Sequence, residues 1–100
     1  MILAGLALAG ELTVWHAYRG GERDTLEAVL RDWSAHHPEA RATPLFVPYE
    51  TLGSKVEAAV PRGNGPDLFL FAHERVAEWV QAGLVVPVPE DAAFYPVTTA

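Results

Sequence analysis

The stretch GPDLFLFAHERVAEWVQAGLVVPV (Gly65–Val88) changes character midway along its length. It begins with an apolar run, Asp67–Phe71, of the kind that forms central strands buried on both faces of a sheet. Val76, Trp79 and Val80 follow at helical spacing, so we expect a helix that turns these side chains inward. A buried strand followed directly by an amphipathic helix is the repeating unit of an α/β fold.

The two ends of this predicted helix carry further signals. We expect the helix to end at Gly83, because glycine has no Cβ and therefore suits the C′ position. The residues after it, LVVPV (84–88), predict a possible last strand, which Pro87 weakens. At the other end, His73–Arg75 place polar side chains where the strand stops and the helix starts. Free backbone N–H groups and polar side chains can meet a ligand there.

The residues before Gly65 repeat the alternation of strand and helix. Leu12–Tyr18 is rich in β-branched and aromatic residues and predicts a strand. Glu22–His36 predicts an amphipathic helix, which Pro38 closes. Its apolar stripe consists of Leu26, Val29, Leu30 and Trp33.

A second strand and a second helix complete the pattern. Residues 40–48 form an extended segment that should lie at a sheet edge or begin after Pro44, because proline cannot donate to a ladder. Leu52, Val56 and Val60 mark a short helix stopped by Pro61. The order favours a three-layer α/β/α fold with a mainly parallel sheet. If the first strand is central, residues 16–21 and 72–75 lie side by side at the carboxyl ends of the strands.

Composition narrows the function. One hundred residues indicate a single compact unit or a piece of one. A net charge of -6 with seven scattered basic residues makes nucleic acid and anionic membranes poor partners. The chain has no cysteine, which excludes disulfides, thiolate metal sites and cysteine nucleophiles.

The first residues, MILAGLALA (1–9), are apolar but far shorter than the ~20 residues that span a bilayer. Ala7–Ala9 fits the small-x-small pattern that precedes a signal-peptide cleavage site. We interpret residues 1–9 as the remnant of an export signal. The alternative is an apolar lead-in that packs beside the first strand.

The sequence gives little support for a dinucleotide site, a metal site or a catalytic site. The segment YRGGER (18–23) lacks the glycine spacing of a dinucleotide site, and no two histidines stand at H-E-x-x-H spacing, so no metal site is expected. Ser34 and Ser54 fall in predicted helices rather than in a nucleophile elbow. Glu22 and Glu74 could be drawn as an acid and base pair, but both also suit solvated helix starts. No reaction is visible.

Residues 65–88 resemble the maltose-binding family of periplasmic solute-binding proteins, the substrate receptors of carbohydrate ABC importers. The features that carry the resemblance are Gly65-Pro66-Asp67, the aromatic Phe71, Ala72-His73, the acid Glu74, Arg75, and Ala82-Gly83-Leu84 after the helix. It extends more loosely to Leu12–Tyr18, to the helix with Leu26 and Trp33, and to Phe94–Val97.

The resemblance implies two α/β lobes hinged around a sugar-binding cleft, with residues 10–100 forming an incomplete N-terminal lobe. It implies a non-catalytic receptor without cofactor that is exported to the periplasm or another extracytoplasmic space. There it would bind maltose or an oligosaccharide and deliver it to the membrane permease subunits of an ABC importer.

The resemblance also implies contact residues. An aromatic ring after Gly-Pro-Asp stacks on a sugar, and this role passes to Phe71. Glu74 and Arg75 would hydrogen-bond hydroxyls. Tyr18 and Arg19 stand near the position where well-known members carry an Asp-Lys pair that touches sugar. The alternative is that Glu74 and Arg75 are an ordinary surface acid and base and that Phe71 belongs to the core.

Three other functions stay open from the residues alone. The chain would be a small α/β protein-interaction domain if the helix over Glu22–His36 docked a partner. It would be a receptor for a solute other than sugar if the contact residues suited a different ligand. An enzyme would need catalytic groups that these residues do not display.

Overall fold

The computed structural model describes residues 10–87, which form one three-stranded parallel sheet with helices on it. The strand order is β2-β1-β3, so β1 is central, as the predicted arrangement required. The elements in chain order are β1 (Gly10–His16), α2 (Gly20–Ala35), β2 (Ala40–Phe46), α3 (Tyr49–Ala59), the 3₁₀ turn η1 (Val60–Arg62), β3 (Leu68–Phe69), the 3₁₀ turn η2 (His73–Arg75) and α4 (Val76–Gln81). The predictions for residues 1–9, Val88 and Phe94–Val97 lie outside the described residues.

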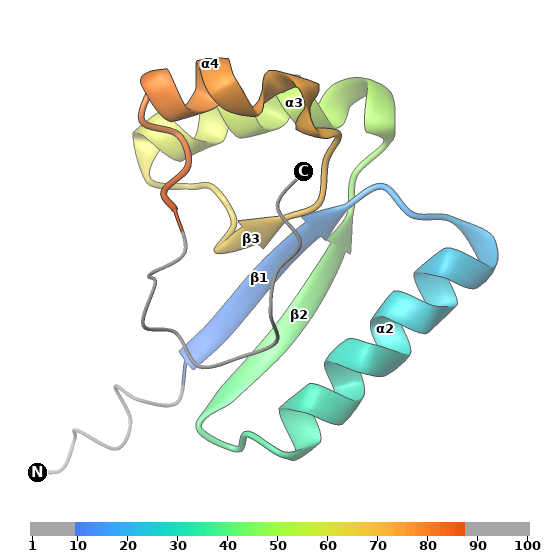
Figure 1. Cartoon of the computed structure of the whole chain (residues 1–100). Coiled ribbons are helices and arrows are strands. Elements are labelled where there is room, and N and C mark those ends of the chain that lie inside the picture. The colour runs from blue at the N-terminus through green and yellow to red at the C-terminus, as the bar shows by residue number, and fades with distance from the viewer. Residues whose placement is uncertain (1–9, 88–100) are drawn as a thin grey trace, which may run out of the picture.

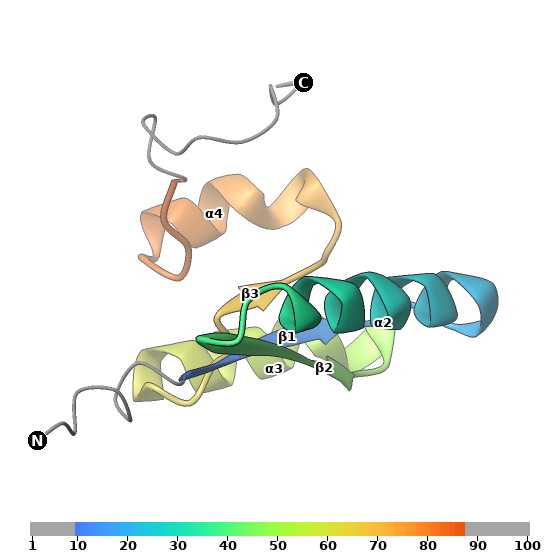
Figure 2. The same ribbon diagram turned by 90° about the horizontal axis from the view of Figure 1, so that it is seen from below.

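Helices cover both faces of the sheet (Figures 1 and 2), which confirms the predicted α/β/α class. Side chains alternate along β1, so Trp15 faces α3 while His16 faces α2. The core lies on the α3 side, where Trp15 packs with Val47, Leu52 and Val56. The core therefore lies next to the carboxyl ends of β1 and β2 and the segments that follow them.

The strand β2 confirms the expectation for a strand with a proline. It lies at one edge of the described sheet, with Pro44 opposite Val14 of β1. Because Pro44 has no N–H, an edge position costs no ladder bond there. α2 packs on β2 through half-buried Leu26, Leu30 and Trp33, but Val29 is exposed, so its place in the predicted apolar stripe was wrong.

The prediction of a central strand over Asp67–Phe71 was wrong. β3 comprises only Leu68–Phe69, and Leu68 is 60% exposed. Within the described residues, β3 is the second edge of the sheet, opposite the edge formed by β2. Helix α2 packs on β2. The face of β3 that carries Leu68 is therefore left exposed.

The Gly-Pro-Asp segment has a structural explanation. A Cβ on Gly65 would lie 2.5 Å from Cγ2 of Val60, so only glycine lets the two segments approach this closely. The Asp67 carboxylate accepts hydrogen bonds from the backbone N–H and the hydroxyl of Thr13, at 2.8 and 3.2 Å. Both contacts fix the start of β3 beside β1.

The predicted third helix is divided into η2 and α4. Trp79 is buried, but Val76 and Val80 are about half exposed, so the inward orientation predicted for them was wrong. Gly83 has a φ of +75° and lies at C′, as predicted. The N–H of Leu84 donates to the carbonyl of Trp79 at 2.9 Å, which closes the helix end.

The predicted last strand is also wrong as far as the structure describes it, because residues 84–87 are not in a strand. Among residues 10–87, no helix combines the length and apolarity needed to cross a lipid bilayer.

Candidate functional site

The segments that follow the three parallel strands meet around one cavity of about 320 Å³. Each strand contributes a wall at its carboxyl end, where parallel sheets gather their ligand sites. The lining residues are Ala17 and Tyr18 after β1, Tyr49 after β2, and Leu70, Phe71 and Ala72 after β3. We call this space the strand-end cavity.

Aromatic rings dominate the strand-end cavity. Tyr49 stacks on Phe71 with ring centroids 5.0 Å apart, and Phe71 stacks on Trp79 at 5.4 Å. Tyr49 is 50% exposed and Tyr18 is 39% exposed, whereas Phe71 is half-buried within the stack. The two tyrosines therefore present free ring surface and hydroxyl groups, and Phe71 supports one of them.

Phe71 is held from below by α3. An ideal Cβ on Gly53 would lie 3.3 Å from Cζ of Phe71, so the ring rests against a helix position that has no side chain. This contact fixes the depth of the ring relative to the strand ends.

Arg75 is engaged with carboxylates. Its guanidinium donates to Glu57 of α3 and, at 2.8 Å, to Glu78 of α4, and it lies 5.1 Å from the centre of the Trp79 ring. The hydrogen bond to Glu78 is the largest cause that raises the pKa of Arg75 above its ordinary value, and the charge of Glu57 acts in the same direction. The indole N–H of Trp79 donates to the same Glu57 oxygen at 2.7 Å.

The other predicted contact residues lie outside the cavity walls. Glu74 is exposed in η2 and lines neither this cavity nor the larger one described below. Arg19 precedes α2, and its guanidinium lies 4.8 Å from the centre of the Phe46 ring. Of the five predicted residues, the structure brings Tyr18 and Phe71 together around one space.

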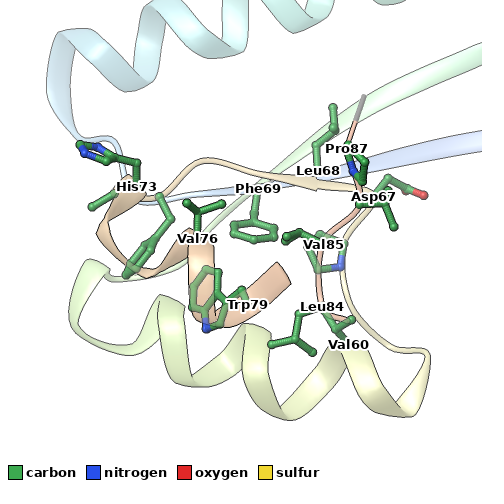
Figure 3. A pocket seen from close by; sticks show the side chains of 14 residues that line it. Val60, Asp67, Leu68, Phe69, His73, Val76, Trp79, Leu84, Val85 and Pro87 are labelled. Carbon is green, nitrogen blue, oxygen red and sulfur yellow. The ribbon is translucent and has the colours of Figure 1, made fainter. Parts of the chain in front are cut away.

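A larger cavity of about 590 Å³ lies between β3, α4 and residues 84–87. Figure 3 shows Phe69, Val76, Trp79 and Val85 around it, and its lining is mainly apolar. Asp67 lies at its margin but is already bonded to Thr13. This space suits apolar packing better than a ligand rich in hydroxyl groups.

Sequence reasoning missed Tyr49. It considered the carboxyl ends of the first and third strands but not that of the second, where Tyr49 follows Pro48. The signal was available, because the carboxyl ends of neighbouring parallel strands lie at one edge of the sheet.

Comparisons with known proteins agree with this architecture. The family model described as bacterial extracellular solute-binding protein matches residues 19–100. A maltotriose-binding protein of Pyrococcus abyssi (strain GE5 / Orsay) is 28% identical over 82 residues, which cover 82% of this chain and 18% of that protein. A solved structure, the maltose/maltodextrin-binding domain MalE from Bdellovibrio bacteriovorus bound to maltotriose, has a TM-score of 0.68 at 23% identity and shares the fold. That match covers 73% of this chain and 19% of the other, so the chain spans about a fifth of the length of these relatives.

Proposed function

Because the chain belongs to the bacterial extracellular solute-binding protein family, we propose that it forms part of a receptor for a maltodextrin-type sugar. The receptor would act outside the cytoplasm, without catalysis or a cofactor, and would deliver the sugar to the permease subunits of an ABC importer. Residues 10–100 would belong to its first lobe, and residues 1–9 to the end of an export signal. The relative and the solved structure named for maltotriose support the choice of sugar.

The observation that carries the proposal is the pair of exposed tyrosines at the strand-end cavity. A pyranose has one apolar face, which an aromatic ring can cover, and a fringe of hydroxyl groups. Tyr49, supported on Phe71, offers the ring, and the hydroxyl groups of Tyr49 and Tyr18 offer hydrogen bonds. A cavity of about 320 Å³ has the size of a small-ligand site.

The remaining predicted contacts stay part of the proposal. Glu74 is exposed and would reach a sugar from the rim of the cleft. Arg19 would contribute from the start of α2. Arg75 would contact a hydroxyl only by exchanging one of its carboxylate partners, so we assign it chiefly to support of the stack.

Calorimetric titration of the polypeptide at its natural length with maltotriose tests the proposal. Tyr49→Ala should weaken binding by about 1–2 kcal/mol, roughly tenfold, because the sugar loses its stacking surface. Tyr49→Phe separates the ring from the hydroxyl and should lose less. Val29→Ala, a change at an exposed position on α2, is the matched control and should bind as the parent does.

Two results would count against the proposal. Absence of maltotriose binding by the folded parent protein would remove the assignment to a maltodextrin-type sugar. Equal affinities of the parent protein and Tyr49→Ala would remove the strand-end cavity as the site.

A further inference from the structure

His16, the last residue of β1, is fully buried between the sheet and α2. Its Nδ1 accepts a hydrogen bond from the backbone N–H of Tyr18 at 3.1 Å. Because an imidazole nitrogen that accepts carries no proton, the ring proton lies on Nε2. That Nε2 is buried, and none of residues 10–87 provides it with a hydrogen-bond partner.

The surroundings of His16 disfavour a second proton. Burial is the main cause that lowers the pKa of His16 below its ordinary value of 6.5, and the positive charge of Arg23 on α2 adds to it, while Glu27 on α2 opposes it. The Phe46 ring of β2 lies edge-on 6.0 Å away, and the guanidinium groups of Arg19 and Arg23 lie over that ring. Burial and the charge of Arg23 therefore both disfavour the protonated imidazole.

We infer that His16 is a positioning residue for the strand-end cavity, which holds Tyr18 in place while the imidazole is neutral and releases it when the imidazole is protonated. This inference rests on the proposed function, because it assigns Tyr18 to the sugar site. His16 itself does not line the cavity.

The consequence of protonation follows from the hydrogen-bond inventory. A proton on Nδ1 would face the N–H of Tyr18, so the acceptor is lost and two donors oppose each other. The imidazolium would also carry two buried N–H groups next to Arg23. The least costly response is for residues 17–19 to move away, which displaces the Tyr18 ring from the cavity wall.

Two variants separate positioning from simple packing. His16→Asn keeps an acceptor, because Oδ1 of asparagine occupies the place of Nδ1, and it does not titrate. His16→Leu fills a similar volume but has no acceptor. Hydrogen exchange at the Tyr18 amide, followed by NMR, measures whether its hydrogen bond to residue 16 is intact, and it needs no ligand. Calorimetry with maltotriose at about pH 7.5 and about pH 5 reads its effect on binding.

We expect the Tyr18 amide to exchange about tenfold faster in His16→Leu than in the parent protein, and maltotriose affinity to fall about tenfold. The parent should lose affinity at the lower pH. His16→Asn should keep Tyr18 protection and bind within about threefold of the parent at both pH values. If His16→Leu does not fold, the loss of pH dependence in His16→Asn carries the test.

The outcomes distinguish this inference from the proposed function. Unchanged exchange of the Tyr18 amide in His16→Leu overturns the inference whatever the sugar affinity. Faster exchange with unchanged affinity overturns the positioning role. A pH dependence of binding that persists in His16→Asn overturns the switch. If no variant binds maltotriose, the proposed function fails, and exchange at the Tyr18 amide alone decides whether His16 holds the segment.

Discussion

Arg75 donates a hydrogen bond to Glu57, and this ion pair ties the turn before α4 to the last turn of α3. The indole N–H of Trp79 joins the same carboxylate oxygen. Since Trp79 stacks on Phe71, and Phe71 on Tyr49, the ion pair secures the far end of an aromatic row that reaches the strand-end cavity.

Glu57→Leu should destabilise the fold and loosen this row. The buried Trp79 indole would lose its acceptor, which costs about 1–3 kcal/mol in the free energy of unfolding. Urea unfolding followed by tryptophan fluorescence measures it. Glu78→Gln, which removes only the more exposed partner of Arg75, is the control and should change little. Equal stability of Glu57→Leu and the parent protein would contradict the role given to Glu57.

Gly65→Ala should destabilise the chain by about 1–3 kcal/mol, because a Cβ would overlap Val60 and force the backbone apart. The restricted unfolded chain offsets only about 0.4–1 kcal/mol of this loss. Gly21→Ala is the matched control, since a Cβ there meets no atom within 4 Å and the residue is helical. The midpoint of thermal unfolding should be lower for Gly65→Ala than for the parent protein, and it should not be lower for Gly21→Ala. Similar midpoints would show that the contact yields without cost.

Acidification should weaken the fold through His16. The folded state lowers the pKa of His16, so the unfolded chain takes up the proton first as the pH falls below 6.5. The free energy of unfolding should therefore decrease from that pH downward until His16 also titrates in the folded state. Unfolding by urea at a series of pH values measures this decrease. His16→Asn should show a shallower decrease, and an identical slope in both proteins would rule His16 out as its source.

Glu74→Ala should weaken maltotriose binding by about 1–3 kcal/mol if its carboxylate accepts from a sugar hydroxyl. Stability should stay unchanged, because Glu74 is exposed. Glu22→Ala, another exposed acid in the first turn of a helix, is the control. An unchanged dissociation constant for Glu74→Ala would remove this residue from the site and leave the tyrosines to account for binding.

The local patterns of the sequence were enough for the fold class. The spacing of apolar residues, together with the glycines and prolines between the segments, predicted β1, α2, β2 and α3. Pro44 indicated the edge position of β2. The burial of β3 and α4 was not predictable in this way, because apolar residues such as Leu68 and Val80 show what can be buried but not what covers them.

The candidate site was predictable in position but not in composition. Topology indicated the carboxyl ends of the strands, and Tyr18 and Phe71 do meet there. Which other residues line the cavity depends on the direction of their side chains. Arg75 turns to Glu57, a residue far away in sequence, and no local pattern reports such a pairing. Tyr49 lines the cavity because only two residues separate the end of β2 from the start of α3.

The three walls of the strand-end cavity differ in how freely they can evolve. Tyr18 and Tyr49 project from connecting segments, so exchanging either would leave the packing of Trp15, Leu52 and Val56 intact. Phe71 is different, because its stacking on Trp79 couples that wall to the interior. During selection for a new solute, Tyr18 and Tyr49 could therefore be replaced with little effect on the fold. Replacement of Phe71 would also affect the stability of the protein.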